Sequence, residues 1–227
     1  MLQASSRLEL SLRLQSSQAT IGEVFSFVSG LYFRGKLAYA WQFARPPVGI
    51  SGVRIITSSS GLLPPDFVAS LDWLRATTKS SIDPDNPQYR DLLVRDVQFI
   101  CISLSQGARV VLLGSIATPK YVAPLLEVFG PRVFYPLDFA GRGDMSGGSL
   151  LLRCTRENRE LSYAVLARSQ GEGAKRHSNF RDVPLGLSSR YQAFPVIPTR
   201  QCWKRAGWDG SDHCSTEVAA TASYAVS

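Results

Sequence analysis

Short apolar runs alternate along this sequence with stretches of helical periodicity, and glycine or proline separates most of them. The run Val110–Leu113 is apolar at every position, which is typical of a buried parallel strand. From Tyr89 to Leu104, apolar residues recur at i, i+3, i+4 and i+7, which predicts a long amphipathic helix that ends near Gly107. The alternation predicts an α/β fold with a mostly parallel sheet and helices on both of its faces.

The other elements follow from the same two periodicities and from the residues that interrupt them. Strands are expected at 24–28, 53–57, 109–113 and 133–135, and helices at 31–41, 67–74 (capped by Asp66), 89–104 and 119–129. The runs 149–154 and 160–166 predict a C-terminal hairpin.

The periodicity divides the chain into three parts. With 227 residues, of which 44% are hydrophobic, the chain is long and apolar enough to bury a core. Regular alternation predicts one α/β domain over residues 20–167, preceded by an N-terminal extension over residues 1–19. After Ala167 the pattern disappears, so residues 168–227 are expected to form an irregular or disordered tail.

Several features bear on location. Apolar runs such as Val110–Leu113 fall far short of the roughly 18–20 residues that a membrane-spanning helix needs. Arg7, Glu9 and Arg13 interrupt the N-terminal leucines and leave no apolar core for a secretion signal, although an organelle transit peptide is an alternative. The four cysteines form no C-x-x-C pair and are expected to be reduced. We therefore expect a cytoplasmic protein without a membrane partner.

The formal net charge of +7 is distributed unevenly. Residues 1–45 carry +3, residues 46–167 carry +1, and residues 168–227 carry +3. A basic chain attracts polyanions, because contacts with phosphates release counterions. The position of the excess at the two ends favours non-specific attraction over a dedicated groove.

Three loops follow predicted strands and are rich in small residues. In an open α/β sheet, ligands bind in the crevice beyond the carboxyl ends of the strands. Such loops are also needed simply to turn the chain, and none matches G-x-G-x-x-G or the P-loop pattern. The candidate ligand-binding residues in these loops are Ser58, Ser60, Gly61, Gly114, Ser115, Lys120, Arg142 and Asp144.

Candidate catalytic groups are Asp66 and Asp138, which could act as carboxylates in acid–base chemistry, although helix caps and surface loops use the same residues. No cofactor is expected. Cys202, His213 and Cys214 could ligate zinc, but their spacing fits no common module and a fourth ligand is not evident, so no metal is expected either.

Four short blocks of the sequence lie at 31–40, 60–66, 113–114 with 121–126, and 135–137. Together they resemble the ordered blocks of an uncharacterised bacterial family that accompanies nucleic-acid modification systems and is more distantly similar to the peroxide-stress protein YaaA. The resemblance spans residues 24 to about 150 and implies an α/β fold, a cytoplasmic location and a connection to nucleic acids or nucleobases. It places the loop from Gly61 to Asp66, and Arg142, at positions of the family's site. The family carries a Ser-Cys-Lys cluster where this chain has Val28-Ser29-Gly30.

These observations lead to one functional expectation and two alternatives. The first is a nucleic-acid-associated or nucleotide-binding protein whose partner is DNA, RNA, a nucleotide or a nucleoside, and a role in stress is one variant of this expectation. Trp203, Lys204, Arg205 and Trp208 interleave aromatic and basic residues as single-strand binders do. The alternatives are a hydrolase or transferase that acts on the glycosidic bond of a nucleoside, and a protein-interaction module.

Overall fold

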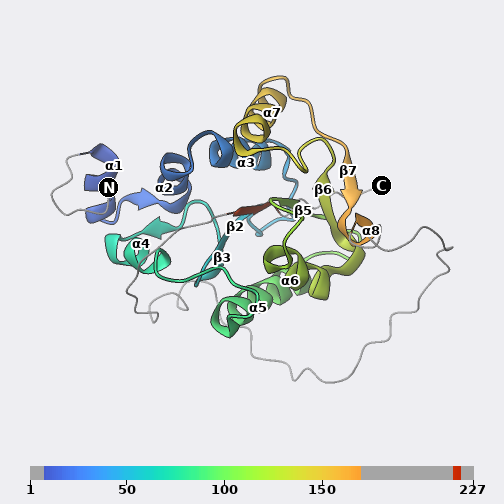
Figure 1. Cartoon of the computed structure of the whole chain (residues 1–227), viewed down its shortest axis with the longest axis horizontal. Coiled ribbons are helices and arrows are strands. Elements are labelled where there is room, and N and C mark those ends of the chain that lie inside the picture. The colour runs from blue at the N-terminus through green and yellow to red at the C-terminus, as the bar shows by residue number, and fades with distance from the viewer. Residues whose placement is uncertain (1–7, 170–216, 221–227) are drawn as a thin grey trace.

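The computed structural model describes residues 8–169 and 217–220, which form a mixed α/β fold (Figure 1). None of the helices in these residues is long and apolar enough to cross a membrane. The helices are α1 (Glu9–Gln15), α2 (Ile21–Val28), α3 (Gly30–Phe43), α4 (Leu71–Thr77), α5 (Pro87–Ser103), α6 (Pro119–Phe129), the 3-10 helix η1 (Gly130–Arg132), α7 (Asp144–Arg156) and α8 (Leu166–Ser169). The strands are β1 (Ala19–Thr20), β2 (Val53–Thr57), β3 (Gly61–Leu63), β4 (Val68–Ala69), β5 (Val110–Leu113), β6 (Val133–Pro136), β7 (Tyr163–Val165) and β8 (Glu217–Ala220).

The main sheet has six strands in the order β3-β2-β8-β5-β6-β7. Of its five strand pairs, β5–β6 is parallel and the other four are antiparallel. The expected mostly parallel sheet is therefore wrong, although an α/β fold with helices on both faces is present. The difference arises because β3, β7 and β8, none of them predicted with their observed partners, all pair antiparallel to the strands beside them.

Strand β8 comes from the stretch that the sequence analysis places in the tail. It lies at the centre of the sheet, where it pairs with β2 on one side and with β5 on the other. The chain from β2 to β5 thus skips one strand position, and residues 217–220 fill that position (Figure 1). A segment of four residues carries too little periodicity to be recognised, because its identity as a strand depends on the two strands that receive it.

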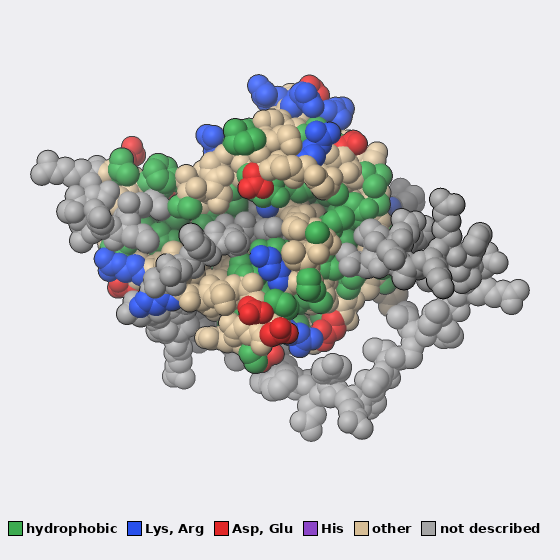
Figure 2. Space-filling model, in the orientation of Figure 1, with side chains coloured by type: hydrophobic (Ala, Val, Ile, Leu, Met, Phe, Trp, Pro, Cys, Tyr) green, Lys and Arg blue, Asp and Glu red, His purple; other side chains and the backbone are tan. Residues whose placement is uncertain are grey.

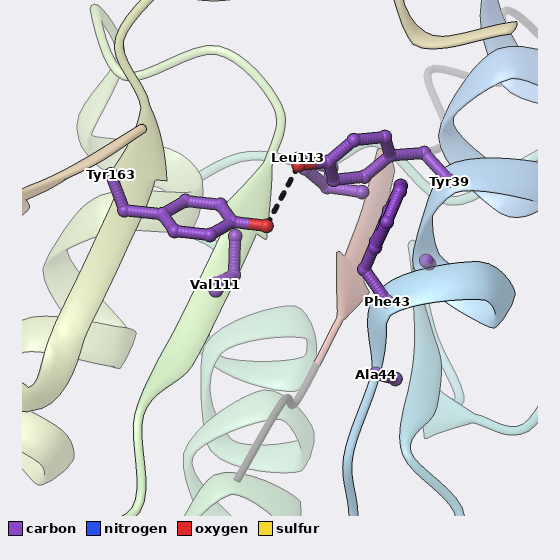
Figure 3. A pocket seen from close by; sticks show the side chains of 7 residues that line it. Tyr39, Phe43, Ala44, Val111, Leu113 and Tyr163 are labelled. Carbon is purple, nitrogen blue, oxygen red and sulfur yellow. Dashed lines mark hydrogen bonds between the residues drawn. The ribbon is translucent and has the colours of Figure 1, made fainter. Parts of the chain in front are cut away.

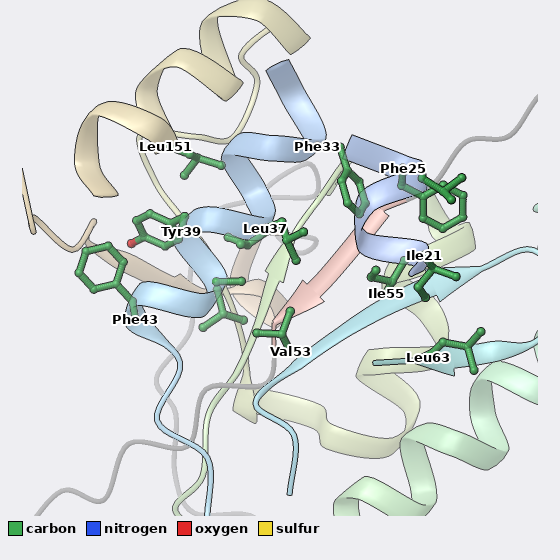
Figure 4. Close-up of a cluster of buried hydrophobic side chains, with 14 of the residues drawn as sticks. Ile21, Phe25, Phe33, Leu37, Tyr39, Phe43, Val53, Ile55, Leu63 and Leu151 are labelled. Atoms are coloured by element: carbon green, nitrogen blue, oxygen red, sulfur yellow. The ribbon is translucent and has the colours of Figure 1, made fainter. Parts of the chain in front are cut away.

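The two faces of the sheet carry separate apolar clusters. Along β5, Val111 and Leu113 contribute to one cluster, and Val110 and Leu112 to the other, as the period of two along a strand requires. Helices α2, α3 and α7 cover the first face (Figure 4), and α5 and α6 cover the second. Every residue of β5 is buried, in agreement with its unbroken apolar run.

The N-terminal region differs from the expectation in two ways. Residues 24–28 belong to helix α2 rather than to a strand, because Thr20 and Glu23 form a capping box that starts the helix at Ile21. In addition, Leu14 of α1 and Ala19 of β1 are fully buried in the first cluster. The fold therefore includes part of the 1–19 segment that the sequence analysis treats as an extension.

Two further predictions are wrong. Asp66 does not cap a helix, since α4 begins only at Leu71, where Ser70 accepts a hydrogen bond from the Trp73 amide. The 149–154 run forms part of helix α7 and not one arm of a hairpin. Its buried residues recur at helical spacing, and the second arm, β7, pairs with β6 instead.

Helices α3 and α7 pack against each other at glycines. A Cβ atom on Gly148 would lie 2.6 Å from the Leu31 carbonyl oxygen, and one on Gly35 would lie 2.5 Å from the Gly148 carbonyl oxygen. Near the other ends of the helices, Gln42 donates a hydrogen bond to the Asn158 side chain. The two helices therefore run in the same direction with their backbones in close contact.

Candidate functional site

The Ser58-Ser59-Ser60 loop is the turn of an antiparallel hairpin between β2 and β3. Ser58 donates to the Thr77 carbonyl, and Ser60 accepts a hydrogen bond from the Trp73 indole at 3.3 Å. Gly61 has φ +66°, which suits the left-handed position that closes a three-residue hairpin loop. The hydroxyls of Ser58 and Ser60 thus hold the loop to α4 and its C-terminal end.

A partly buried carboxylate that sequence reasoning missed lies beside this hairpin. Asp96 of α5 accepts a hydrogen bond from the Leu62 amide at 2.8 Å and pairs with Arg95. Burial raises the pKa of Asp96, while the Leu62 amide and the Arg95 and Arg54 charges oppose the rise. Strand β3 lies at the edge of the sheet, so one side of its backbone has no neighbouring strand. We interpret Asp96 as the acceptor that satisfies the outward-facing amide of Leu62 in this strand.

The second loop, Gly114 to Lys120, leads into α6. The Ser115 hydroxyl accepts from the Ala117 amide, and the Lys120 carbonyl accepts from the Tyr89 hydroxyl at 2.9 Å. The Lys120 ammonium lies 4.9 Å from the centre of the Tyr121 ring. Thr118 is the N-cap of α6, yet its side chain accepts no capping hydrogen bond.

The third loop joins β6 to α7 and is mostly exposed. Arg142 donates to the backbone carbonyl of Asp138, and Asp144 lies in the first turn of α7, where its charge is favourable. Beneath the loop, the Phe139 ring stacks on Tyr32 with centroids 5.9 Å apart. The Lys36 ammonium is buried 3.9 Å from the centre of that Tyr32 ring.

The two candidate catalytic residues, Asp66 and Asp138, follow strands that run towards opposite ends of the sheet. Strands β2, β5 and β6 run in one direction and β3 runs in the other. Asp138 follows β6 and Asp66 follows β3, with β2, β8 and β5 between these two strands. Both carboxylates are exposed. The structure therefore does not bring Asp66 together with Asp138 and Arg142 in one crevice.

A small cavity opens between α3 and the sheet (Figure 3). It is lined by apolar side chains and by two tyrosines, and its cavity volume is about 10 Å³, which is about the room that one water molecule needs. Pockets for drug-sized ligands measure roughly 300–1,000 Å³, so a nucleoside does not fit. The lining residues are Tyr39, Ala40, Phe43, Ala44, Val111, Leu113 and Tyr163.

The two tyrosines form a chain of hydrogen bonds. The Leu161 amide donates to the Tyr39 hydroxyl, which lies 2.8 Å from the Tyr163 hydroxyl, and Tyr163 donates to Glu160. Burial raises the pKa of Tyr39 to about 12, and burial also raises the pKa of Tyr163. Both phenols are therefore protonated at neutral pH, which suits a structural link between α3 and the segment after α7.

The outer surface of α3 and α7 carries uncompensated positive charge. Arg153 and Arg156 lie three residues apart on the exposed side of α7, and neither forms an ion pair with any described residue. Figure 2 shows Lys and Arg side chains gathered over α7, with few acidic ones among them. Of the nearby carboxylates, Glu157 pairs with Arg159 and Glu160 accepts the Tyr163 hydrogen bond.

Helix α3 adds to this charge. Residues 24–65 contain four basic residues and no acidic one. Arg34 lies on the exposed side of α3 and donates to the Gly30 carbonyl, and Arg45 is exposed just beyond the helix and donates to the Gln42 carbonyl. We call Arg34, Trp41, Arg45, Arg153 and Arg156 the α3–α7 outer surface. Dividing the net charge along the sequence at residue 45 hides this set, because Arg153 and Arg156 lie far from α3 in sequence.

Other candidates lie partly or wholly outside the described residues. Cys202, His213, Cys214 and the Trp203–Trp208 segment belong to the residues that the structure does not describe. Within the described ranges, no group of three or more His, Cys, Asp or Glu side chains is placed to hold a metal ion. Cys101 and Cys154 are free thiols.

Comparison with known proteins gives no relative for this chain: no family model, no curated protein and no solved structure matches it.

Proposed function

We propose that this protein associates with nucleic acid through the α3–α7 outer surface. The observation that carries the proposal is the pair Arg153 and Arg156, two exposed guanidinium groups without an ion pair in the described part of the chain. Phosphate contacts by such groups release counterions and supply most of the affinity in sequence-independent binding. A guanidinium also donates two parallel hydrogen bonds to one phosphate.

The helix dipole gives a second explanation for part of this charge. Arg153 and Arg156 stand in the last turns of α7, where a cation gains about 0.3–1 kcal/mol. That explanation does not extend to Arg34, which lies in the N-terminal half of α3. Nor does it account for the absence of acidic residues from 24 to 65.

The outer surface is a better candidate than the three loops. Ser58, Ser60 and Ser115 already make hydrogen bonds within the protein. The separated positions of Asp66 and Asp138 leave glycosidic-bond hydrolysis without an assembled carboxylate pair. We therefore base the proposal on phosphate binding by the surface arginines and assign no catalytic role.

The test is the binding of the full chain to a fluorescently labelled DNA duplex, followed by anisotropy over a range of salt concentrations. We expect log affinity to fall linearly with log salt. Replacing both arginines in R153Q/R156Q should weaken binding and reduce the steepness of the slope by about 2, since each lost phosphate contact contributes about 0.9. The absence of binding at low salt both to this duplex and to a single strand of the same length, or an unchanged slope in the variant, would overturn the proposal.

A further inference from the structure

Trp41 is the most exposed aromatic side chain on the α3–α7 outer surface, with 60% of its surface accessible. Tryptophan is usually well covered, because its ring offers a large apolar area. The ring of Trp41 makes no stacking or cation–π contact with the described residues. An exposed flat ring in a basic surface is the arrangement on which a base can stack.

The other tryptophan in the described part of the chain shows the contrast. Trp73 donates its indole N–H to Ser60, and its ring lies against Phe25 and Phe67. Those contacts give Trp73 a clear structural role between α2, α4 and the hairpin loop. Trp41 has no comparable set of contacts with residues 8–169, so packing among these residues does not explain why a large ring stands at this position.

Trp41 shares one side of α3 with a positive charge. Arg34, Ala38 and Trp41 follow one another at spacings of four and three residues, which puts them on one side of the helix. With a rise of 1.5 Å per residue, Arg34 lies about 10 Å from Trp41 along the axis. Arg45 lies beyond the C-cap residue Ala44, outside α3, and its guanidinium donates to the Gln42 and Ala44 carbonyls. This side of α3 therefore presents the Trp41 ring together with the Arg34 charge.

We propose that the nucleic acid bound by this surface is single-stranded, with an unpaired base stacked on Trp41 and a neighbouring phosphate held by Arg34. The inference rests on the proposed function. In a duplex the base faces are covered by their neighbours, so Trp41 has nothing to stack on. Arginines, in contrast, contact the phosphates of both forms. A stacking residue thus gives a preference for single strands that charge alone does not give.

The test compares a labelled oligothymidylate with a duplex of the same length, both titrated with the full chain. The variants are W41A, W41F and a matched control, F99A, which removes an aromatic ring that is 51% exposed on α5, on the opposite face of the sheet. Because stacking contributes about 1–3 kcal/mol per base, W41A should weaken single-strand binding about 5- to 160-fold and leave its salt slope unchanged. W41F should retain part of the affinity, and F99A should bind like the wild type. Thermal melting confirms that each variant folds.

The outcomes separate this inference from the proposal on which it rests. If W41A binds the oligothymidylate as tightly as the wild type, or loses duplex affinity to the same extent, the stacking role is refuted while phosphate binding by Arg153 and Arg156 stands. If the wild type binds neither form at low salt, both proposals are refuted. Quenching of tryptophan fluorescence by the single strand, present in the wild type and absent in W41A, would support the assignment directly.

Discussion

The two helical layers of this protein differ in whether their charged side chains form ion pairs with other described residues. On the α5–α6 side, Arg90 pairs with Glu127 between the two helices, and Arg95 pairs with Asp96. On the α3–α7 side, the helices meet through glycine backbones, and Arg34, Arg153 and Arg156 have no ion pair with a described residue. Charges on the first layer help to join elements, whereas charges on the second remain available to a ligand. The difference locates the candidate site on a helix surface, away from the strand ends.

Removing β8 should produce the largest effect, because this strand lies between the parts of the sheet on which both layers rest. A chain that ends at residue 216 leaves one side of β2 and one side of β5 without hydrogen-bond partners. We expect a loss of more than about 4 kcal/mol in the free energy of unfolding. Urea denaturation of this chain and of the full chain gives the measurement, and equal midpoints would show that β8 is not part of the folded sheet.

The close contact between α3 and α7 gives the next largest effect. In G148A, the new methyl group meets the Leu31 carbonyl, so the helices must separate, at a cost of about 1–3 kcal/mol. This cost exceeds the gain of about 1 kcal/mol in helix propensity. The neighbouring exposed position supplies the control, since S149A should change stability by less than about 0.5 kcal/mol. If both variants melt at the wild-type temperature, the contact between these helices is looser than described.

The tyrosine pair links the α3–α7 layer to the end of the sheet. Y39F removes the hydroxyl that accepts from the buried Leu161 amide, and we expect a loss of about 1–2 kcal/mol. Y163F should cost less, because Tyr39 then still accepts the amide hydrogen bond. Chemical denaturation of the two variants measures this order, and a larger loss in Y163F would contradict the described hydrogen-bond chain.

Asp96 in the α5–α6 layer should have a small effect on the free energy of unfolding, and this effect should depend on pH. Its pKa is raised by burial above 3.8, so the folded state binds this proton more tightly than the unfolded state. The contribution of Asp96 to stability therefore increases as the pH falls through the raised pKa towards 3.8. In D96N, the side-chain amide oxygen still accepts a hydrogen bond from the Leu62 amide. The variant cannot bind the proton, however, so its stability does not gain from protonation at this position as the pH falls. The difference in unfolding free energy between wild type and D96N should shift in favour of the wild type on acidification, and a shift in the other direction would refute the raised pKa.

Local signals determined which parts of the fold could be predicted. Strand β2 matches the expected 53–57 run, and α6 begins at Pro119 and is followed by Gly130, as expected. Helix α5 covers most of the predicted 89–104 range, because its amphipathic pattern continues over a long stretch of sequence. Helix α2 was missed because its five-residue apolar run is compatible with either structure, and the capping box at Thr20 and Glu23 decides between them.

The candidate site was harder to predict because it depends on contacts between distant residues. Arg90 and Glu127 are 37 positions apart in sequence, and only the packing of α5 on α6 brings them together. A sequence shows which residues are charged, but the fold decides which of the charges are paired. For the same reason, the small-residue loops resembled ligand sites until the structure showed their hydroxyls bonded to Thr77, Trp73 and Ala117.

The comparison of two pairs of arginines tests the central claim most directly. R153Q/R156Q removes two charges without an ion pair in the described structure, and R75Q/R90Q removes two that are paired with Asp72 and Glu127. Each variant changes the net charge equally, and the salt dependence of nucleic-acid binding is measured for both. The account predicts that the slope of log affinity against log salt becomes less steep by about 2 in R153Q/R156Q and stays at the wild-type value in R75Q/R90Q. Equal slopes in the two variants would show that binding follows total charge and would contradict the assignment of the site to the α3–α7 outer surface.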